Sequence, residues 1–173
     1  MEDPVSSKLR DGATVLLRRL GPSDIDAVKE LHNRLTKEEL YLRFFTPHPG
    51  FLPELADQLT DSGGQNYALG AFEADELVGV ANYAMCGKPA TADVAAVVAH
   101  GDHSRGVGTA LLRRLVHVAR VNGVRHLVGD VLSANSAMFD LLHEAGLKPQ
   151  RKAYDCGVVH LDVDLSGAEF DSV

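Results

Sequence analysis

Residues 95–112 combine three features whose order restricts what the chain can fold into. An apolar run at 95–99 is followed by a polar loop with three glycines, and the loop leads into an amphipathic helix. The first amides of a helix have no partners within it, and they lie at the positive end of the helix dipole. Gly106 and Gly108 tolerate positive φ and permit a close backbone approach to a ligand. The segment is therefore typical of a strand–loop–helix site for phosphate or pyrophosphate.

Charge is distributed unevenly around this loop. The 173-residue chain has a formal net charge of −7, which disfavours general nucleic-acid binding. No Asp or Glu occurs between His103 and Gly129, however, and this range contains five arginines. A basic segment in an acidic chain is more consistent with an anionic small ligand than with a solvated helix face alone.

Length and composition indicate one globular domain, because 45% hydrophobic and 24% charged residues are ordinary for such chains. The N-terminus lacks the basic and apolar regions of a signal peptide. No apolar run reaches the roughly 20 residues that a membrane span needs. We therefore expect a cytoplasmic protein with no membrane partner. Cys86 and Cys156 match no metal-binding spacing and are expected to be reduced thiols.

Hydrophobic periodicity predicts an α/β domain with one mixed sheet. A flexible lead-in is expected at 1–12, the folded domain at 13–165 and a C-terminal tail at 166–173. Strands are expected at 13–20, 66–74, 77–86, 91–99, 125–132, 148–156 and 158–165. Helices are expected near 23–35, 36–45, 52–59, 105–121 and 135–144. The helix after the glycine loop would then form a right-handed crossover between two strands.

Other kinds of glycine loop fit the residues less well. A Walker A loop needs Gly-x-x-x-x-Gly-Lys-Ser/Thr, and this run does not occur in the sequence. A Rossmann fingerprint starting at Gly106 would need its third glycine where Leu111 stands, although Asp130 lies where a ribose-binding acid would be expected. The loop also follows a late strand rather than the first one, which disfavours a dinucleotide site.

The loop at 103–108 resembles the Gln/Arg-x-x-Gly-x-Gly/Ala loop of the GCN5-related N-acetyltransferases, the GNAT family. The segment from Asn135 through Gly146 and Leu147 resembles its counterpart in that family. The resemblance covers nearly the whole domain and implies a GNAT fold, in which helices flank a single mixed, mostly antiparallel central sheet. It also implies an enzyme that moves the acetyl group of acetyl-CoA, its co-substrate, to an amine without a metal.

In this family the loop amides hold the pyrophosphate of acetyl-CoA, and the preceding strand separates from its neighbour to admit the pantetheine arm. The resemblance implies that backbone groups of Val97 and Val98, and the side chain of Asn135, bind that arm. Met138 and Leu142 would face the cofactor or belong to the core. The residues implied around the pyrophosphate are His103, Ser104, Arg105, Gly106, Val107, Gly108 and Thr109.

Residues 40–47 and 93–98 resemble a narrower group, the bacterial Pat-type protein lysine acetyltransferases. This resemblance implies a protein substrate with an acceptor lysine, for example an acyl-CoA synthetase, and a regulatory domain or partner outside this chain. Pat-type enzymes place a Glu where Asp93 stands, so Asp93 is expected to be the general base that deprotonates the lysine ammonium. The N–H of Val98 is expected to stabilise the oxyanion. Glu73, His100 and Asp130 are lesser candidates for the base.

Three residues depart from the family pattern. His103 stands where the loop usually has Gln or Arg, so Arg105 is the residue expected to pair with phosphate. Asp93 is one methylene shorter than Glu, which favours a bridging water. Leu142 stands where many members have a Tyr that protonates the leaving thiolate. Either the thiolate leaves without a dedicated acid, or a water or Ser136 replaces the Tyr. A small-amine acetyltransferase and a non-catalytic acyl-CoA-binding sensor therefore stay open as alternatives.

The glycine loop also contains residue types that bind metal ions. His100, Asp102 and His103 are metal-ligating residue types within four positions of one another. The loop itself offers no further ligand, and the family resemblance already gives it a phosphate-binding role. We therefore expect no metal.

Overall fold

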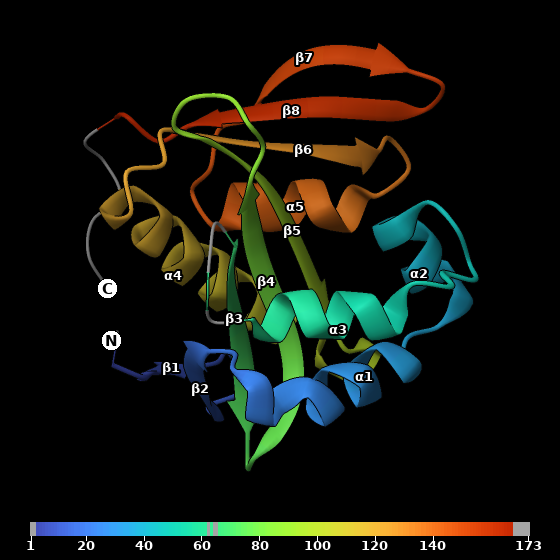
Figure 1. Cartoon of the computed structure of the whole chain (residues 1–173), viewed down its shortest axis with the longest axis vertical. Coiled ribbons are helices and arrows are strands. Elements are labelled where there is room, and N and C mark those ends of the chain that lie inside the picture. The colour runs from blue at the N-terminus through green and yellow to red at the C-terminus, as the bar shows by residue number, and fades with distance from the viewer. Residues whose placement is uncertain (1–2, 62, 64–65, 168–173) are drawn as a thin grey trace.

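A computed structural model describes residues 3–61, 63 and 66–167, which form eight strands and five α-helices around one sheet (Figure 1). The strands are β1 (Val5–Lys8), β2 (Thr14–Arg19), β3 (Asn66–Glu73), β4 (Glu76–Met85), β5 (Thr91–Val98), β6 (His126–Leu132), β7 (Gln150–Asp155) and β8 (Val158–Asp164). The helices are α1 (Ile25–Asn33), α2 (Lys37–Phe44), α3 (Leu52–Thr60), α4 (Val107–Val121) and α5 (Ser136–Glu144), with short 3₁₀ turns at Pro22–Asp24 and His100–Asp102.

The strand order in the sheet is β1-β2-β3-β4-β5-β6-β8-β7. Neighbouring strands are antiparallel except β5 and β6, which are parallel because α4 crosses over between them. The expected fold, a single mixed and mostly antiparallel sheet flanked by helices, is confirmed. Within the described part of the chain, no helix is both long and apolar enough to cross a bilayer.

Two apolar clusters cover the two faces of the sheet. The buried side chains of Leu31 on α1 and Leu59 on α3 pack with Val80 of β4, and Figure 1 shows α1 and α3 lying along the sheet. Ala81, the next residue on β4, belongs to the other cluster, together with Leu115 of α4. Successive side chains of a strand point to opposite faces, so α4 and the α1–α3 pair sandwich the central strands.

Strands β5 and β6 separate in the middle of the sheet. They pair only from Thr91 with His126 to Asp93 with Val128, whereas β5 continues to Val98 against β4. Beyond Asp93 the two strands diverge, and this divergence opens the sheet on the side that leads to α4.

Two expected boundaries differ from the structure. The segment 1–12, expected as a flexible lead-in, contains β1, which pairs antiparallel with β2, and Leu9 behind it is buried. The polar composition of β1 concealed it, because an edge strand needs only one partner and little apolar surface. Helix α4 begins at Val107 rather than at 105, because Gly106 has a φ of 97° and cannot be helical. Most of the expected tail at 166–173 lies outside the described residues.

Candidate active site

A groove of about 590 Å³ opens where β5 and β6 separate. Its walls come from β5, β6, the glycine loop, α2 and α5. Nearly all the residues predicted for the site line it, which brings together segments from three parts of the chain. These are Asp93, Val97, Val98, His103, Ser104, Gly106, Val107, Gly108, Thr109, Asn135, Met138 and Leu142.

The glycine loop presents the first turn of α4 to this groove. Gly106 is the N-cap of α4, and its left-handed φ of 97° turns the chain into the helix. The first intrahelical hydrogen bond runs from the Ala110 N–H to the Gly106 carbonyl at 3.0 Å. The amides of residues 107–109 therefore precede the helical ladder, and this first turn carries no acidic residue. Such a turn can bind a phosphate through its N–H groups and the helix dipole.

Gly108 has a second role, which is to let α5 pack closely. A Cβ at this position would lie 3.0 and 3.2 Å from the two terminal methyl carbons of Leu141, and 3.4 Å from a methyl carbon of Val98. The glycine therefore provides contact space for α5 and β5.

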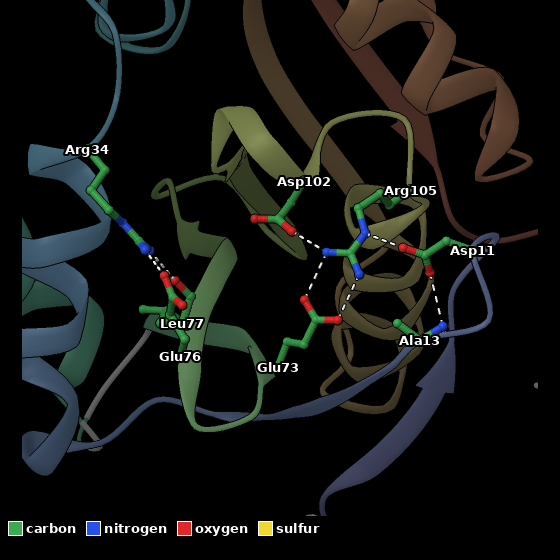
Figure 2. Close-up of polar contacts among 8 residues, drawn as sticks. All are labelled: Asp11, Ala13, Arg34, Glu73, Glu76, Leu77, Asp102 and Arg105. Carbon is green, nitrogen blue, oxygen red and sulfur yellow. Dashed lines mark hydrogen bonds and ion pairs between the residues drawn. The ribbon is translucent and has the colours of Figure 1, made fainter.

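Arg105 differs from its expected role, because its guanidinium is bound by three carboxylates and its side chain does not line the groove (Figure 2). Its Nε donates to Asp11 at 2.5 Å, its Nη1 and Nη2 donate to Glu73 at 2.8 and 2.7 Å, and Nη1 also contacts Asp102. Hydrogen bonding to Arg105 lowers the pKa of both Asp11 and Glu73, and the same contacts raise the pKa of Arg105. Arg105 thus joins the loop to the N-terminal segment and to the end of β3.

Arg10, which the sequence did not single out, is the arginine that lines the groove beside the loop. Its backbone N–H donates to the carbonyl of Arg105 at 3.0 Å, and its Nη1 donates to the carbonyl of Ser104 at 3.3 Å. Its Nη2 lies 2.6 Å from a carboxylate oxygen of Glu144 on α5. The N-terminal segment therefore carries a cation to the place where Arg105 was expected to provide one.

Asp93 lies at the last pair of residues that joins β5 to β6, where the groove begins. Partial burial raises the pKa of its carboxyl, the Asp130 charge raises it further, and Arg43 opposes the shift. Burial also lowers the pKa of Arg43, on α2, to about 10. A carboxylate with a raised pKa is a stronger proton acceptor and is suited to act as a base.

The other candidate bases have partners of their own. Glu73 is bound to Arg105, and Asp130, although it lines the groove, is hydrogen-bonded to His160. His100 is not among the described residues that line the groove.

The backbone N–H and carbonyl of Val98 point away from β4, toward the gap between β5 and β6. The N–H of Ala99 donates to the carbonyl of Val78 on β4 at 2.9 Å. Because backbone N–H groups alternate in direction along a strand, the N–H of Val98 faces the other side, where β6 has moved away. Its carbonyl accepts on that side from Nε2 of His103, at 2.9 Å.

Helix α5 places three further predicted residues along the groove. The side-chain oxygen of the buried Asn135 caps the helix by accepting from the Met138 N–H at 3.1 Å, which leaves its amide group for other contacts. Leu142 is buried and packs in the larger core cluster as well as lining the groove. Its hydrocarbon side chain has no acidic proton to donate to a leaving group.

Comparison with known proteins identifies relatives over most of the chain. The model of the acetyltransferase (GNAT) family matches residues 28–147. Acetyltransferase PA5475 of Pseudomonas aeruginosa is 33% identical over 152 residues, which are 85% of this chain and 82% of that protein. The GNAT domain of S. lividans PAT superimposes with a TM-score of 0.84 and 28% identity, covering 93% of this chain and 96% of that domain.

More distant structures share the fold. The protein yncA of Salmonella typhimurium, whose structure contains its cofactor acetyl-CoA, has a TM-score of 0.69 at 20% identity and covers 92% of this chain and 99% of its own. A cAMP-binding acyltransferase of Mycobacterium smegmatis has a TM-score of 0.64 at 21% identity. It matches 96% of this chain, which spans only 48% of the mycobacterial protein.

Proposed function

We propose that this chain, which belongs to the acetyltransferase (GNAT) family and is an acetyl-CoA-dependent N-acetyltransferase, acetylates a lysine side chain on a protein. In this proposal Asp93 is the general base. The observation that carries the proposal is the position of Asp93 in the groove, with a raised pKa, where the two strands part. A carboxylate at this point attracts a lysine ammonium and can take its proton.

The acidic lining of the groove supports a cationic acceptor. Asp93 and Asp130 are accompanied along the groove by Glu39 and Asp140, and also by Asp102 and Glu144, which contact Arg105 and Arg10. Acidic walls concentrate a cationic side chain near the reaction centre. The similarity of residues 40–47 and 93–98 to Pat-type enzymes favours a lysine on a protein, and an acyl-CoA synthetase is the example we would test first.

The reaction is proposed to proceed by direct transfer in a ternary complex. The amides at the start of α4 hold the pyrophosphate of acetyl-CoA, and the divergence of β5 and β6 receives the pantetheine arm. Asp93 removes a proton from the lysine ammonium, directly or through a water, and the free amine attacks the thioester carbonyl carbon. The N–H of Val98 stabilises the oxyanion that forms. The nitrogen of the tetrahedral intermediate gives its second proton to water in the groove, the C–S bond breaks, and the product amide and the coenzyme A thiolate separate.

The leaving thiolate needs no proton from Leu142 in this scheme, because a thiolate is a tolerable leaving group. Ser136 is exposed at the start of α5 and is not among the described residues that line the groove. Water that enters the groove is therefore the better proton source for the departing sulfur.

The proposed acceptor is tested by measuring acetyl transfer to a lysine-bearing peptide and, in parallel, to polyamines and amino acids. Asp93→Asn is expected to lower kcat about 10²- to 10⁴-fold, the usual contribution of a general base, while the Kd for acetyl-CoA stays the same. Asp57→Asn, which removes an exposed carboxylate on α3, serves as the matched control.

Each alternative has its own outcome. Unchanged turnover in Asp93→Asn removes Asp93 as the base. Transfer to small amines but not to peptides identifies a small-amine acetyltransferase. Tight acetyl-CoA binding with no turnover on any acceptor identifies a non-catalytic sensor. A regulatory domain or partner outside this chain is also proposed, and would appear as a change in turnover when candidate partner proteins are added.

A further inference from the structure

We propose that Glu39, His100 and His103 form a binding site for a transition-metal ion of the Zn²⁺ type at the rim of the groove. The sequence offered His100 and His103 beside Asp102, but Asp102 contacts Arg105 in the structure. The fold supplies the third ligand, because α2 packs near the end of β5 and brings Glu39 to the 3₁₀ turn that carries His100.

The three ligand atoms are spaced as a metal site requires. Oε1 of Glu39 lies 3.2 Å from Nδ1 of His100 and 3.2 Å from Nε2 of His103. All three atoms lie within 4.8 Å of one another. A tetrahedral Zn²⁺ with bonds of about 2.0–2.2 Å separates its ligand atoms by roughly 3.3–3.6 Å. Small side-chain adjustments would therefore admit an ion between them.

Glu39 is oriented for this role by the first turn of its helix. Its Oε2 accepts from the backbone N–H of Thr36 at 2.8 Å, while its own N–H donates to Oγ1 of Thr36 at 3.2 Å. This capping box uses one carboxylate oxygen and leaves Oε1 directed at the histidines. A hydrogen bond that fixes a ligand's orientation is a regular feature of metal sites.

The donor set selects the class of ion. Two imidazole nitrogens and one carboxylate oxygen are typical of zinc sites that keep an open fourth position. Ca²⁺ and Mg²⁺ prefer sites built from oxygen alone. The side chain of His100 is 75% exposed, so an ion can reach the site from solvent.

The site is linked to the groove through His103. Nε2 of His103 is hydrogen-bonded to the carbonyl of Val98 at 2.9 Å. The same nitrogen cannot donate a proton to that carbonyl and its lone pair to a metal, so binding of the ion would end this hydrogen bond. Metal occupancy would therefore change the surroundings of Val98, whose N–H faces the groove.

The test uses Co²⁺ as a spectroscopic probe on the full chain after removal of metals. Coordination by nitrogen and oxygen ligands is expected to give visible d–d absorption that saturates at one ion per chain and is displaced by Zn²⁺. Calorimetric titration with Zn²⁺ alone gives the affinity.

Two variants remove ligands in different ways. Glu39→Gln keeps the capping box, since Gln also closes it, but removes the anionic ligand. His100→Ala removes an exposed imidazole with little effect on packing. Each is expected to weaken Zn²⁺ binding on the order of 100-fold or more, because losing even an outer-shell partner commonly costs 10- to 100-fold. His117→Ala, at an exposed position on α4, removes one histidine elsewhere as the matched control.

Circular dichroism confirms that each variant is folded. The proposal is overturned if the wild-type chain gives no saturable Co²⁺ absorption, or if His117→Ala weakens Zn²⁺ binding as much as His100→Ala does. Should Glu39→Gln fail to fold, His100→Ala still decides the question.

Discussion

Gly108→Ala separates two reasons for a glycine at the start of α4, close packing and access for the ligand. The added Cβ would lie 3.0 and 3.2 Å from the terminal carbons of Leu141, whereas non-bonded carbons prefer about 3.5–4.0 Å. Leu141 must therefore move by roughly 0.5 Å. Overpacking of this kind costs about 1–3 kcal/mol, and the better helix propensity of Ala returns at most about 1 kcal/mol. With the full helix-propensity gain, we expect a net loss of up to about 2 kcal/mol in the free energy of unfolding.

The matched background is Leu141→Ala, which removes both carbons that the new Cβ would contact. In that background Gly108→Ala should be neutral or slightly stabilising, so the double-mutant cycle should give a coupling energy of at least about 1 kcal/mol. Urea denaturation of the four proteins measures it. An equal cost of Gly108→Ala in both backgrounds would refute the packing argument.

The same four proteins test the ligand. If the Cβ also obstructs the pyrophosphate, the Kd for acetyl-CoA should be about tenfold or more higher in the double variant than in Leu141→Ala, since neither protein has the packing conflict. A tenfold change in Kd corresponds to about 1.4 kcal/mol. An unchanged Kd in the double variant would show that Gly108 serves packing alone. Calorimetric titration with acetyl-CoA distinguishes the two results.

Three further predictions concern backbone strain, acid stability and the pH dependence of turnover. Gly106→Ala should lower the free energy of unfolding by about 1–2 kcal/mol in urea denaturation, because a φ of 97° is costly for a residue with a Cβ; no loss would contradict this. Arg105→Gln should lower the Tm at neutral pH and flatten its fall in acid. Arg105 lowers the pKa values of Asp11 and Glu73 in the folded state. The stabilisation from these two carboxylates is therefore complete above their unfolded pKa values and is lost as pH falls through their folded pKa values. Parallel plots of Tm against pH for the variant and the wild type would contradict this prediction. In wild type, kcat/KM should fall in acid as Asp93 becomes protonated, at a pH above the ordinary Asp pKa because burial and the Asp130 charge raise the pKa of this carboxyl. Asp93→Asn should lack this limb of the profile.

The sequence alone predicted the strand–loop–helix unit, and the family resemblance named most of the residues that line the groove. The unit was predictable because the features that define it are local. The positive φ of Gly106, the apolar run of β5 and the periodicity of α4 are set by neighbouring residues in the chain. The resemblance of the segment that starts at Asn135 then indicated the second wall of the same groove.

Residues that act through distant partners could not be predicted in this way. The carboxylates that hold Arg105 include Asp11 and Glu73, which lie 94 and 32 positions away in the chain. The polar strand β1 has no apolar pattern that would reveal it, so Arg10 stayed unnoticed as a groove residue. Glu39 lies 61 positions before His100 in the chain, and only the fold brings their side chains to 3.2 Å.

The sequence by itself therefore determined the type of each central element and the glycine-containing turn before α4. Tertiary structure alone decided which charges meet around that turn. Local sterics and side-chain periodicity are encoded by adjacent residues, whereas the partners of a charged side chain are set by how separate elements pack. For this reason the glycine loop was predictable, while the pairing of Arg105 and the grouping of Glu39 with two histidines were not.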